Sequence, residues 1–277
     1  MKGIAKQLRV GKGKVKLGRW DPDSTPGCKD RADAEARTEA NLERIDALQY
    51  GLHAEGARSL LIVLQGMDTA GKDGLIRKVM TAFNPQGCRV TPFKVPTPLE
   101  AAHDFLWRIH QAAPARGEVA IFNRSHYEDV LVARVHGLVP RKVWMRRYGS
   151  INRFERHLEE HGTRVLKFFL HISRKEQKKR LLARLDDTRK NWKFSEGDIA
   201  ERSHWSAYQR AYADALERCS PPSAPWYVIP ADAKWYRNLA VSEIVADALE
   251  AMDPRPPRVN LDVARLKRRL VRGDGPA

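Results

Sequence analysis

A short glycine-rich segment directly after a run of apolar residues constrains the fold more than any other feature of this chain. Residues 59–64 read SLLIVL and residues 66–74 read GMDTAGKDG. A continuous apolar run of this length is typical of a buried parallel strand, and residues 75–82 have the composition of a helix. A strand, a glycine-rich turn and a helix in this order form a phosphate-binding P-loop. The segment therefore predicts an α/β fold that binds phosphate.

The glycine-rich segment matches the pattern G-x-x-x-x-G-K-[ST] at every position except the last. Backbone N–H groups of such a loop surround an anion, and the lysine reaches the transferring phosphates as a point charge. Lys72 is therefore a candidate catalytic residue. The loop residues that we expect to bind phosphate are Gly66, Ala70, Gly71, Asp73 and Gly74. The alternative is a chance glycine-rich turn with an exposed lysine.

Asp73 occupies the position at which a Ser or Thr hydroxyl normally ligates Mg²⁺ in this pattern. Mg²⁺ keeps several waters and is usually bound by one or two carboxylates together with substrate phosphates. Asp68, inside the loop, is the first candidate for such a ligand and for a catalytic role. Asp73 is the second, because an Asp in the first turn of a helix more commonly serves the helix dipole. The sequence therefore predicts an oxygen-ligated Mg²⁺ or Mn²⁺ at the loop.

Strands and helices alternate along the rest of the chain. The expected strands are residues 59–64, 89–93, 118–122, 164–172 and 226–229, and the expected helices are residues 31–56, 75–82, 98–112, 140–160, 175–185 and 236–251. This alternation predicts a parallel sheet with helices on both faces, in a single domain at residues 31–252. We expect residues 1–30 to form a basic N-terminal arm, extended over residues 11–26. We expect residues 253–277 to form a tail with a basic amphipathic helix at 261–270.

A second polar segment follows the third expected strand, where residues 121–129 read IFNRSHYED. Ligands of parallel sheets bind beyond the carboxyl ends of the strands, so this segment should face the P-loop. Asn123 is expected to contact phosphate, and Arg124 is placed to hold a phosphate with two hydrogen bonds. Glu128 is the candidate carboxylate for catalysis and for a further metal contact. The alternative is that Glu128 caps a helix or pairs with a surface arginine. His126 is expected to be a hydrogen-bonded structural group.

A third polar segment lies between the fourth and fifth expected strands, at about residues 184–205. P-loop kinases carry a mobile lid at this position, and its basic side chains close over the phosphates. Arg184, Arg189 and Lys193 are the candidates for that role. A solvated basic face is the alternative interpretation. Asp198 is expected to cap the next helix.

The charge of the chain indicates an anionic partner. Its 277 residues include 50 Lys and Arg against 34 Asp and Glu, so the formal net charge is +16. Nucleic acid, an anionic membrane surface and a small polyanion all fit this charge, and so does a basic surface without a partner. No apolar run reaches the length of a membrane span, and the basic N-terminus lacks the apolar region of a signal peptide. Three widely spaced cysteines predict a reducing, cytoplasmic location.

The chain resembles the polyphosphate kinase 2 family. The resemblance lies in GMDTAGKDG at 66–74, FNRSHYED at 122–129, LKFFLHIS at 166–173, NWKFSEGD at 191–198 and APWYVIPADAKWYRN at 224–238. It runs in order from about residue 19 to residue 252. It implies a thymidylate-kinase-like P-loop fold with a helical lid, dependence on Mg²⁺, and a groove of Lys and Arg that holds polyphosphate. It also implies a homo-oligomer, either a dimer or a tetramer.

Within the resembling family, the residues after the Arg-Ser pair at 124–125 differ between subclasses. Members restricted to nucleoside diphosphates usually read Trp-Tyr-Asn there, whereas this chain reads His126, Tyr127 and Glu128. This reading resembles the subclass that phosphorylates both AMP and ADP. Asn123 together with Glu128 departs from the more common Asp and Asn arrangement.

The resemblance implies reversible transfer of phosphate between inorganic polyphosphate and AMP or ADP, with ADP and ATP as products. An ATP-dependent nucleotide or nucleoside kinase on the same fold is the first alternative, and it leaves the net charge unexplained. A nucleic-acid-binding protein with an incidental P-loop is the second alternative. That function would need aromatic side chains interleaved with a basic patch, whereas most tryptophans fall in expected strands and helices.

Overall fold

A parallel sheet of five strands lies at the centre of the computed structural model, which describes residues 3–189 and 191–271 and only the backbone of Lys193. The strands are β1 (Ser59–Gly66), β2 (Cys88–Pro92), β3 (Val119–Asn123), β4 (Thr163–His171) and β5 (Trp226–Pro230). They lie in the order β2-β3-β1-β4-β5, and every neighbouring pair is parallel. The structure therefore has the parallel α/β sheet that the sequence predicts.

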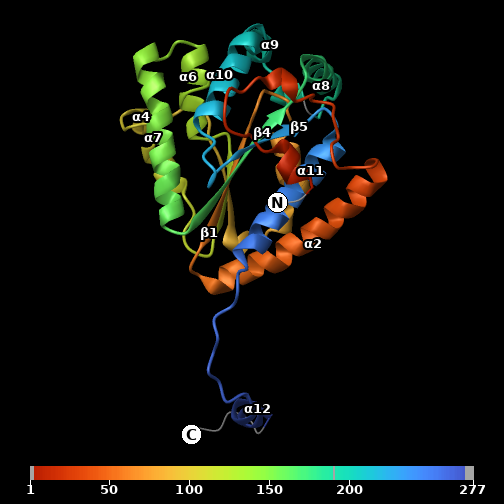
Figure 1. Ribbon diagram of the computed structural model, residues 1–277, viewed down its shortest axis with the longest axis vertical. Coiled ribbons are helices and arrows are strands. Elements are labelled where there is room, and N and C mark those ends of the chain that lie inside the picture. Colours follow the sequence, from red (N-terminus) through yellow and green to blue (C-terminus); the bar gives the residue numbers. More distant parts are fainter. Residues whose placement is uncertain (1–2, 190, 272–277) are drawn as a thin grey trace.

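Helices cover both faces of this sheet. The longer helices are α2 (Arg31–Glu55), α7 (Arg141–Glu160), α8 (Arg174–Asp186), α9 (Glu196–Ser203), α10 (Trp205–Arg218) and α11 (Lys234–Met252). The shorter ones are α1 (Ile4–Leu8), α3 (Lys72–Lys78) and α6 (Val132–Val135), with 3₁₀ turns at η1 (Leu17–Arg19), η2 (Met80–Ala82), η3 (Pro85–Gly87), η4 (His126–Asp129) and η5 (Asn191–Lys193). In Figure 1, α2 and α11 lie on one side of the sheet and α6, α7 and α10 on the other.

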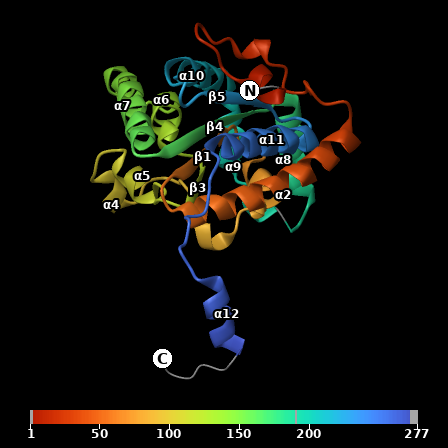
Figure 2. The ribbon, with the colours of Figure 1, turned by 60° about the horizontal axis from the view of Figure 1, so that its bottom comes forward.

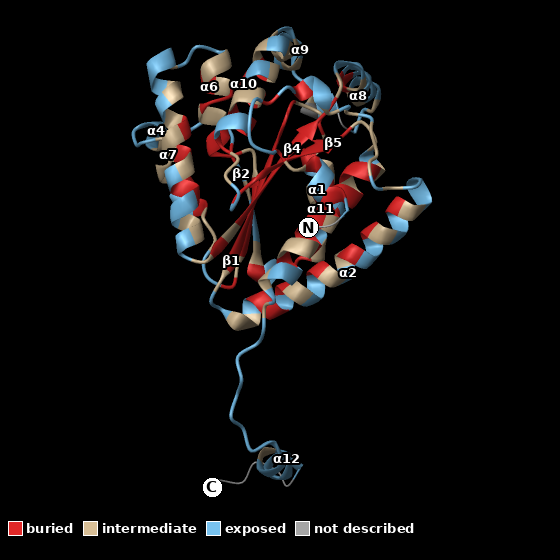
Figure 3. Ribbon diagram, in the orientation of Figure 1, coloured by how far each residue is buried: buried red, intermediate tan, exposed pale blue. Residues whose placement is uncertain are grey.

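The buried residues concentrate on the strands and on the inward sides of the helices (Figure 3). All eight residues of β1 are buried. A strand between two layers of helices has no solvent face, so its side chains form a continuous apolar run instead of alternating with polar ones. This is why residues 59–64 predict a central strand from sequence alone.

The prediction of one continuous helix over residues 98–112 is wrong, because the helix is interrupted in its middle. The structure has two short helices there, α4 (Pro98–Ala101) and α5 (Trp107–Ala112). The Asp104 Oδ1 atom accepts a hydrogen bond from the Leu106 backbone N–H at 2.9 Å. Such a side chain offers the backbone a partner outside the helix and so interrupts it.

The N-terminal residues lie against the domain. Ile4 and Leu8 of α1 are buried, and the Val10 N–H donates to the Trp226 carbonyl oxygen of β5 at 2.8 Å. Residues 11–26 contain turns and one 3₁₀ turn, with no strand. The division of the chain at residues 30 and 252 stays a prediction.

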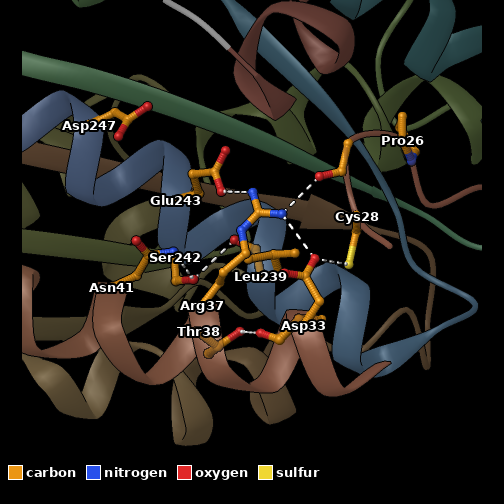
Figure 4. A network of polar contacts seen from close by, with 12 residues as sticks. Pro26, Cys28, Asp33, Arg37, Thr38, Asn41, Leu239, Ser242, Glu243 and Asp247 are labelled. Atoms are coloured by element: carbon orange, nitrogen blue, oxygen red, sulfur yellow. Dashed lines mark hydrogen bonds and ion pairs between the residues drawn. The ribbon is translucent and has the colours of Figure 1, made fainter. Parts of the chain in front are cut away.

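A guanidinium group joins α2 to α11 on the outside of the fold (Figure 4). Arg37 of α2 forms an ion pair with Glu243 of α11 and bonds to Asp33 Oδ2 at 3.2 Å. It also donates to the Gly27 carbonyl oxygen at 2.8 Å. One side chain thereby ties the segment before α2 to both helices.

The end of the described chain forms a separate helix, α12 (Val263–Val271), at the position of the predicted amphipathic helix. Figures 1 and 2 both show it well away from the sheet, at the end of an extended linker. Among the described residues, no helix combines the length and apolar character that crossing a membrane requires.

Candidate active site

The P-loop and the second polar segment lie side by side because of the register of the sheet. Leu64 of β1 pairs with Asn123 of β3, and the Arg124 N–H donates to the Leu64 carbonyl oxygen at 3.0 Å. Both segments therefore leave the sheet at its carboxyl edge, the edge at which parallel sheets bind ligands. This agrees with the position that the sequence predicts for residues 121–129.

The P-loop contains a strained turn. The Ala70 N–H donates to the Met67 carbonyl oxygen at 3.1 Å, and Thr69, the third residue of that turn, has a φ of +61°. Glycine is usual at such a position, and a branched residue there costs on the order of 1–3 kcal/mol. The buried Thr69 Oγ1 also has no hydrogen-bond partner among the described residues. Strain and an orphaned polar group together indicate a loop shaped for a ligand rather than for stability.

Lys72, the first residue of α3, is buried. Its Nζ donates to the Gly66 carbonyl oxygen at 2.7 Å and to that of Met67 at 3.4 Å. Burial lowers the pKa of Lys72, and the charge of Arg124 lowers it further. Within the described residues the ammonium group contacts carbonyl oxygens and forms no ion pair, so its charge remains available to an anion.

Arg124 and Asp68 form an ion pair between the two segments. The Arg124 Nη2 atom lies 3.0 Å from Asp68 Oδ1, and the two side chains are 42% and 30% exposed. Arg124 has a φ of +65°, a second left-handed conformation at a non-glycine residue. Burial raises the pKa of Glu128, although the charges of Arg124 and Lys72 act in the opposite direction. The four residues predicted as catalytic therefore form one cluster.

Asn123 and Asp73, two of the predicted phosphate-binding residues, bond to one another. The Asn123 Nδ2 atom donates to Asp73 Oδ1 at 3.0 Å. The contact ties the start of α3 to the end of β3. It uses one carboxylate oxygen of Asp73, and the second candidate metal ligand of the sequence analysis thus has a structural contact.

Two residues of α8 that sequence analysis missed donate hydrogen bonds to the P-loop backbone. Gln177 Nε2 donates to the Asp68 carbonyl oxygen at 3.0 Å. Arg180 Nη1 donates to the carbonyl oxygens of Thr69 and Ala70, at 3.0 Å and 3.3 Å. The only signal in the sequence is their place on the helix that directly follows β4, whose end lies at the same edge of the sheet.

Behind the second polar segment lies a buried polar cluster, formed by Glu155 of α7, Lys167 of β4 and the two residues that follow Ser125. The Lys167 ammonium contacts a Glu155 carboxylate oxygen and donates to the Cys219 carbonyl oxygen at 2.7 Å. The other Glu155 oxygen accepts from the Tyr127 hydroxyl at 2.8 Å and lies 3.2 Å from His126 Nε2. His126 is thus a buried, hydrogen-bonded group, as predicted.

Two of the three predicted lid residues form ion pairs with carboxylates of the lid segment. Arg184 pairs with Asp198 at 3.5 Å, and Asp198 also completes the capping box of α9 with Ser195. Arg189 is 86% exposed and pairs with Asp187. The side chain of Lys193 lies outside the described part of the structure. The phosphate-binding role of these residues stays a prediction.

A contact connects the predicted lid to the P-loop. Arg202 of α9 donates to Gln177 Oε1 at 2.7 Å. Because the other end of the Gln177 amide bonds to the Asp68 carbonyl oxygen, one side chain spans the two segments. Movement of α9 would therefore change the support of the P-loop.

The carboxylates of the site fit a Mg²⁺ ion. No group of three or more His, Cys, Asp or Glu in the described residues could hold a metal. Mg²⁺ does not need such a group, because one or two carboxylates and substrate phosphates suffice. The Asp68 charge lies close enough to Glu128 to raise its pKa, so a cation at this point would relieve repulsion between the two groups.

This chain is similar to known polyphosphate kinases. The family model for polyphosphate kinase 2 matches residues 28–257. The AMP/ADP-polyphosphate phosphotransferase of Meiothermus ruber is 51% identical over 247 residues, 89% of this chain and 92% of that protein. The ADP-polyphosphate phosphotransferase of Rhodopseudomonas palustris is 44% identical over 265 residues, 91% of this chain and 92% of that protein.

The fold of this chain is also similar to that of solved polyphosphate kinase structures. The crystal structure of polyphosphate kinase 2 from Arthrobacter aurescens matches this structure with a TM-score of 0.95 at 47% identity, over 98% of each chain. A polyphosphate kinase 2 structure from Pseudomonas aeruginosa matches with a TM-score of 0.80 at 34% identity. That match covers 85% of this chain and 50% of the other.

Proposed function

The chain belongs to the polyphosphate kinase 2 family, and we propose that it transfers phosphate between inorganic polyphosphate and AMP or ADP. The observation that carries this proposal is the cluster of Asp68, Lys72, Arg124 and Glu128 at the carboxyl edge of the sheet. A relative named for both AMP and ADP supports the choice of acceptors. The net charge of +16 fits a polyanionic donor.

In the proposed reaction, an oxygen of the terminal phosphate of AMP or ADP attacks the end phosphorus of polyphosphate. A new P–O bond forms, a phosphoanhydride bond breaks, and the polyphosphate leaves one residue shorter. The second pKa of a phosphate monoester is about 6, so the acceptor is already an anion and needs no general base. The task of the site is to hold two polyanions in line and to neutralise the charge between them. Because both donor and product contain phosphoanhydrides, we propose that the reaction is reversible.

The cluster divides into groups with different roles in this proposal. Lys72 and Arg124 bind phosphate oxygens, and Arg124 must exchange its contact with Asp68 to do so fully. Asp68 and Glu128 would hold Mg²⁺, which neutralises phosphate charge when it is bound. The backbone N–H groups of residues 66–74 complete the anion site. Arg184 and Arg189 would contact phosphate only if the predicted lid closes.

Several further properties belong to the proposal. A homo-oligomer, as the family resemblance implies, is proposed for the assembly. A cytoplasmic location is proposed because Cys28, Cys88 and Cys219 are all free thiols. A nucleic-acid-binding function has less support, since six of the seven tryptophans lie at least partly inside the fold and Trp192 is the exposed one.

The decisive experiment supplies long-chain polyphosphate, Mg²⁺ and either AMP or ADP to the purified protein. Formation of ADP from AMP and of ATP from ADP, lost with EDTA or without polyphosphate, is the expected result. Transfer from ATP to a nucleoside or nucleotide without polyphosphate would favour the first alternative function. Binding of single-stranded nucleic acid with no transfer would favour the second.

Replacement of Glu128 by Asn is expected to impair the phosphorylation of AMP more than that of ADP. AMP is one phosphate shorter than ADP, so its acceptor oxygen reaches less far, and a carboxylate-held hydrated Mg²⁺ or water would bridge the gap. We expect the AMP-to-ADP ratio of kcat/KM to fall about tenfold, which is ~1.4 kcal/mol. The measurement is kcat/KM for both acceptors at saturating polyphosphate.

The contrary result of that experiment is an unchanged ratio, with both acceptors slowed alike. This outcome would mean that Glu128 has only a structural role. The helix-capping form of that role has little support, because the following helix, α6, begins after Leu131 and has no side-chain cap hydrogen bond. Glu128→Gln serves as the matched control, because it removes the charge and keeps the side-chain length.

Added salt is expected to weaken polyphosphate binding much more than AMP binding. A polyanion releases condensed counterions when basic groups neutralise it, so the logarithm of its affinity falls linearly with the logarithm of salt concentration. Titrations at about 50 and 200 mM salt would measure both slopes. Equal slopes for the two ligands would contradict a basic groove for polyphosphate.

A further inference from the structure

Arg237 of α11 is a buried guanidinium group beside the P-loop that forms no ion pair with any described residue. The residue is 3% exposed. Its Nε and Nη2 atoms both donate to Asn238 Oδ1, at 3.2 Å and 2.8 Å. Among the described residues, its Nη1 atom has no acceptor and its charge has no carboxylate partner. Burying an unpaired charge is costly, so such a group calls for an explanation.

The unpaired atom lies directly at the P-loop. A Cβ atom built on Gly71 would lie 1.9 Å from Arg237 Nη1, and one built on Gly74 would lie 3.6 Å from Nη2. Only a glycine at position 71 therefore allows the guanidinium group to approach the loop backbone. This is a second requirement for glycine there, in addition to its φ of +103°.

The neighbour of Arg237 increases its positive potential. Burial lowers the pKa of Arg237, and the nearby positive charge of Arg180 adds to this effect. Together they bring the pKa to about 10. The two arginines differ in their contacts, because Arg180 bonds to Glu176 and to carbonyl oxygens of the P-loop and of Ala231 and Asp232. Arg180 is thus satisfied within the protein, whereas Arg237 remains charged at neutral pH with an unfilled donor.

We propose that Arg237 is a phosphate-binding residue, and that its missing counterion is an inorganic phosphate chain held by the P-loop. The orphaned Thr69 Oγ1 in the same loop is an independent sign that a ligand completes this site. Polyphosphate and its short analogue tripolyphosphate have the required chemistry, namely a row of anionic oxygens without a nucleoside. This inference rests on the proposed function for the identity of the phosphate chain.

Binding of tripolyphosphate to the full-length protein tests the proposal. Arg237→Gln removes the charge and keeps two hydrogen-bonding groups, and Arg237→Lys keeps the charge in a smaller group. We expect the Kd for tripolyphosphate to rise at least tenfold in the Gln variant and less in the Lys variant. The slope of log affinity against log salt should also fall by about one charge in the Gln variant. Arg44→Gln is the matched control, because Arg44 of α2 pairs with Asp247 and Glu250 of α11.

Thermal unfolding without ligand supplies a readout that distinguishes this role from simple packing. Because Arg237 carries an uncompensated buried charge, its removal should leave the Tm of the ligand-free protein unchanged or higher. A Kd within twofold of the wild type, or a raised Kd with an unchanged salt slope, would overturn the proposal. Transfer from polyphosphate to AMP by the wild-type protein is measured separately. If the wild-type protein showed no transfer but Arg237→Gln still raised the Kd for tripolyphosphate, the proposed function would be refuted. The phosphate-binding role of Arg237 would stand.

Discussion

Lys72→Ala is expected to abolish phosphate transfer while the protein stays folded. Removal of one preorganised charge from a phosphoryl-transfer site lowers kcat on the order of 10²–10³-fold. Within the described residues, the Lys72 ammonium group hydrogen-bonds only to carbonyl oxygens of the loop, and the charge of Arg124 repels it. Its loss should therefore change the free energy of unfolding very little.

The measurement is kcat with saturating polyphosphate and AMP, alongside Tm by circular dichroism. Lys72→Met is the better-matched variant, because it keeps the unbranched chain in its buried site and removes the charge. Lys78→Met, at the other end of α3, is the control, since Lys78 is exposed and pairs with Glu39. A Lys72→Ala protein that keeps more than a tenth of wild-type kcat would contradict the assignment of this residue.

Lys167→Ala is expected to cost about 3–5 kcal/mol of stability, the range typical when one partner of a buried ion pair is removed. Both Lys167 and Glu155 are at most 1% exposed. Without the ammonium group, the buried Glu155 carboxylate would lose its ion-pair partner and keep only its contacts with the Tyr127 hydroxyl and His126 within the described residues. Urea unfolding at neutral pH measures the loss, and a cost below about 1 kcal/mol would show that the carboxylate finds another partner.

Acid should weaken the wild-type protein through the same pair. Burial alone would raise the pKa of Glu155, but Lys167 and His126 hold it below its usual value. A carboxyl group with a lowered pKa in the folded state contributes stability at neutral pH, and that stability is lost as the pH falls through the folded pKa. The Lys167→Ala protein lacks most of this contribution. Its stability should therefore vary less with pH in the acidic range.

The sequence predicts those parts of the site whose residues lie close together in the chain. Lys72 and Asp68 belong to one loop, and Arg124 and Glu128 follow one strand, so each segment is visible as a motif. Their meeting follows from the rule that parallel strands end at a common edge. The roles assigned to these residues remain predictions.

The parts that sequence does not predict depend on burial. Arg180 belongs to a helix whose basic residues look like a solvated face, and Arg237 belongs to the closing helix after β5. Only tertiary packing brings these two side chains to the P-loop. Lys167 sits in an apolar strand, where its partner on α7 cannot be inferred from spacing. The interruption between α4 and α5 arises from one Asp side chain and leaves no trace in the apolar periodicity.

The contact of the N-terminal residues with β5 has a consequence for the order of folding. The Val10 N–H bonds to Trp226, 216 residues later in the chain, so Ile4 and Leu8 have no complete binding surface until β5 has been synthesised. Contacts between such distant residues form late, because the intervening chain must first become ordered. On the ribosome, Ile4 and Leu8 therefore emerge long before the strand that covers them and are buried late. A chain released before residue 226 would expose them together with an uncovered β4 edge, which is a surface on which sheets aggregate.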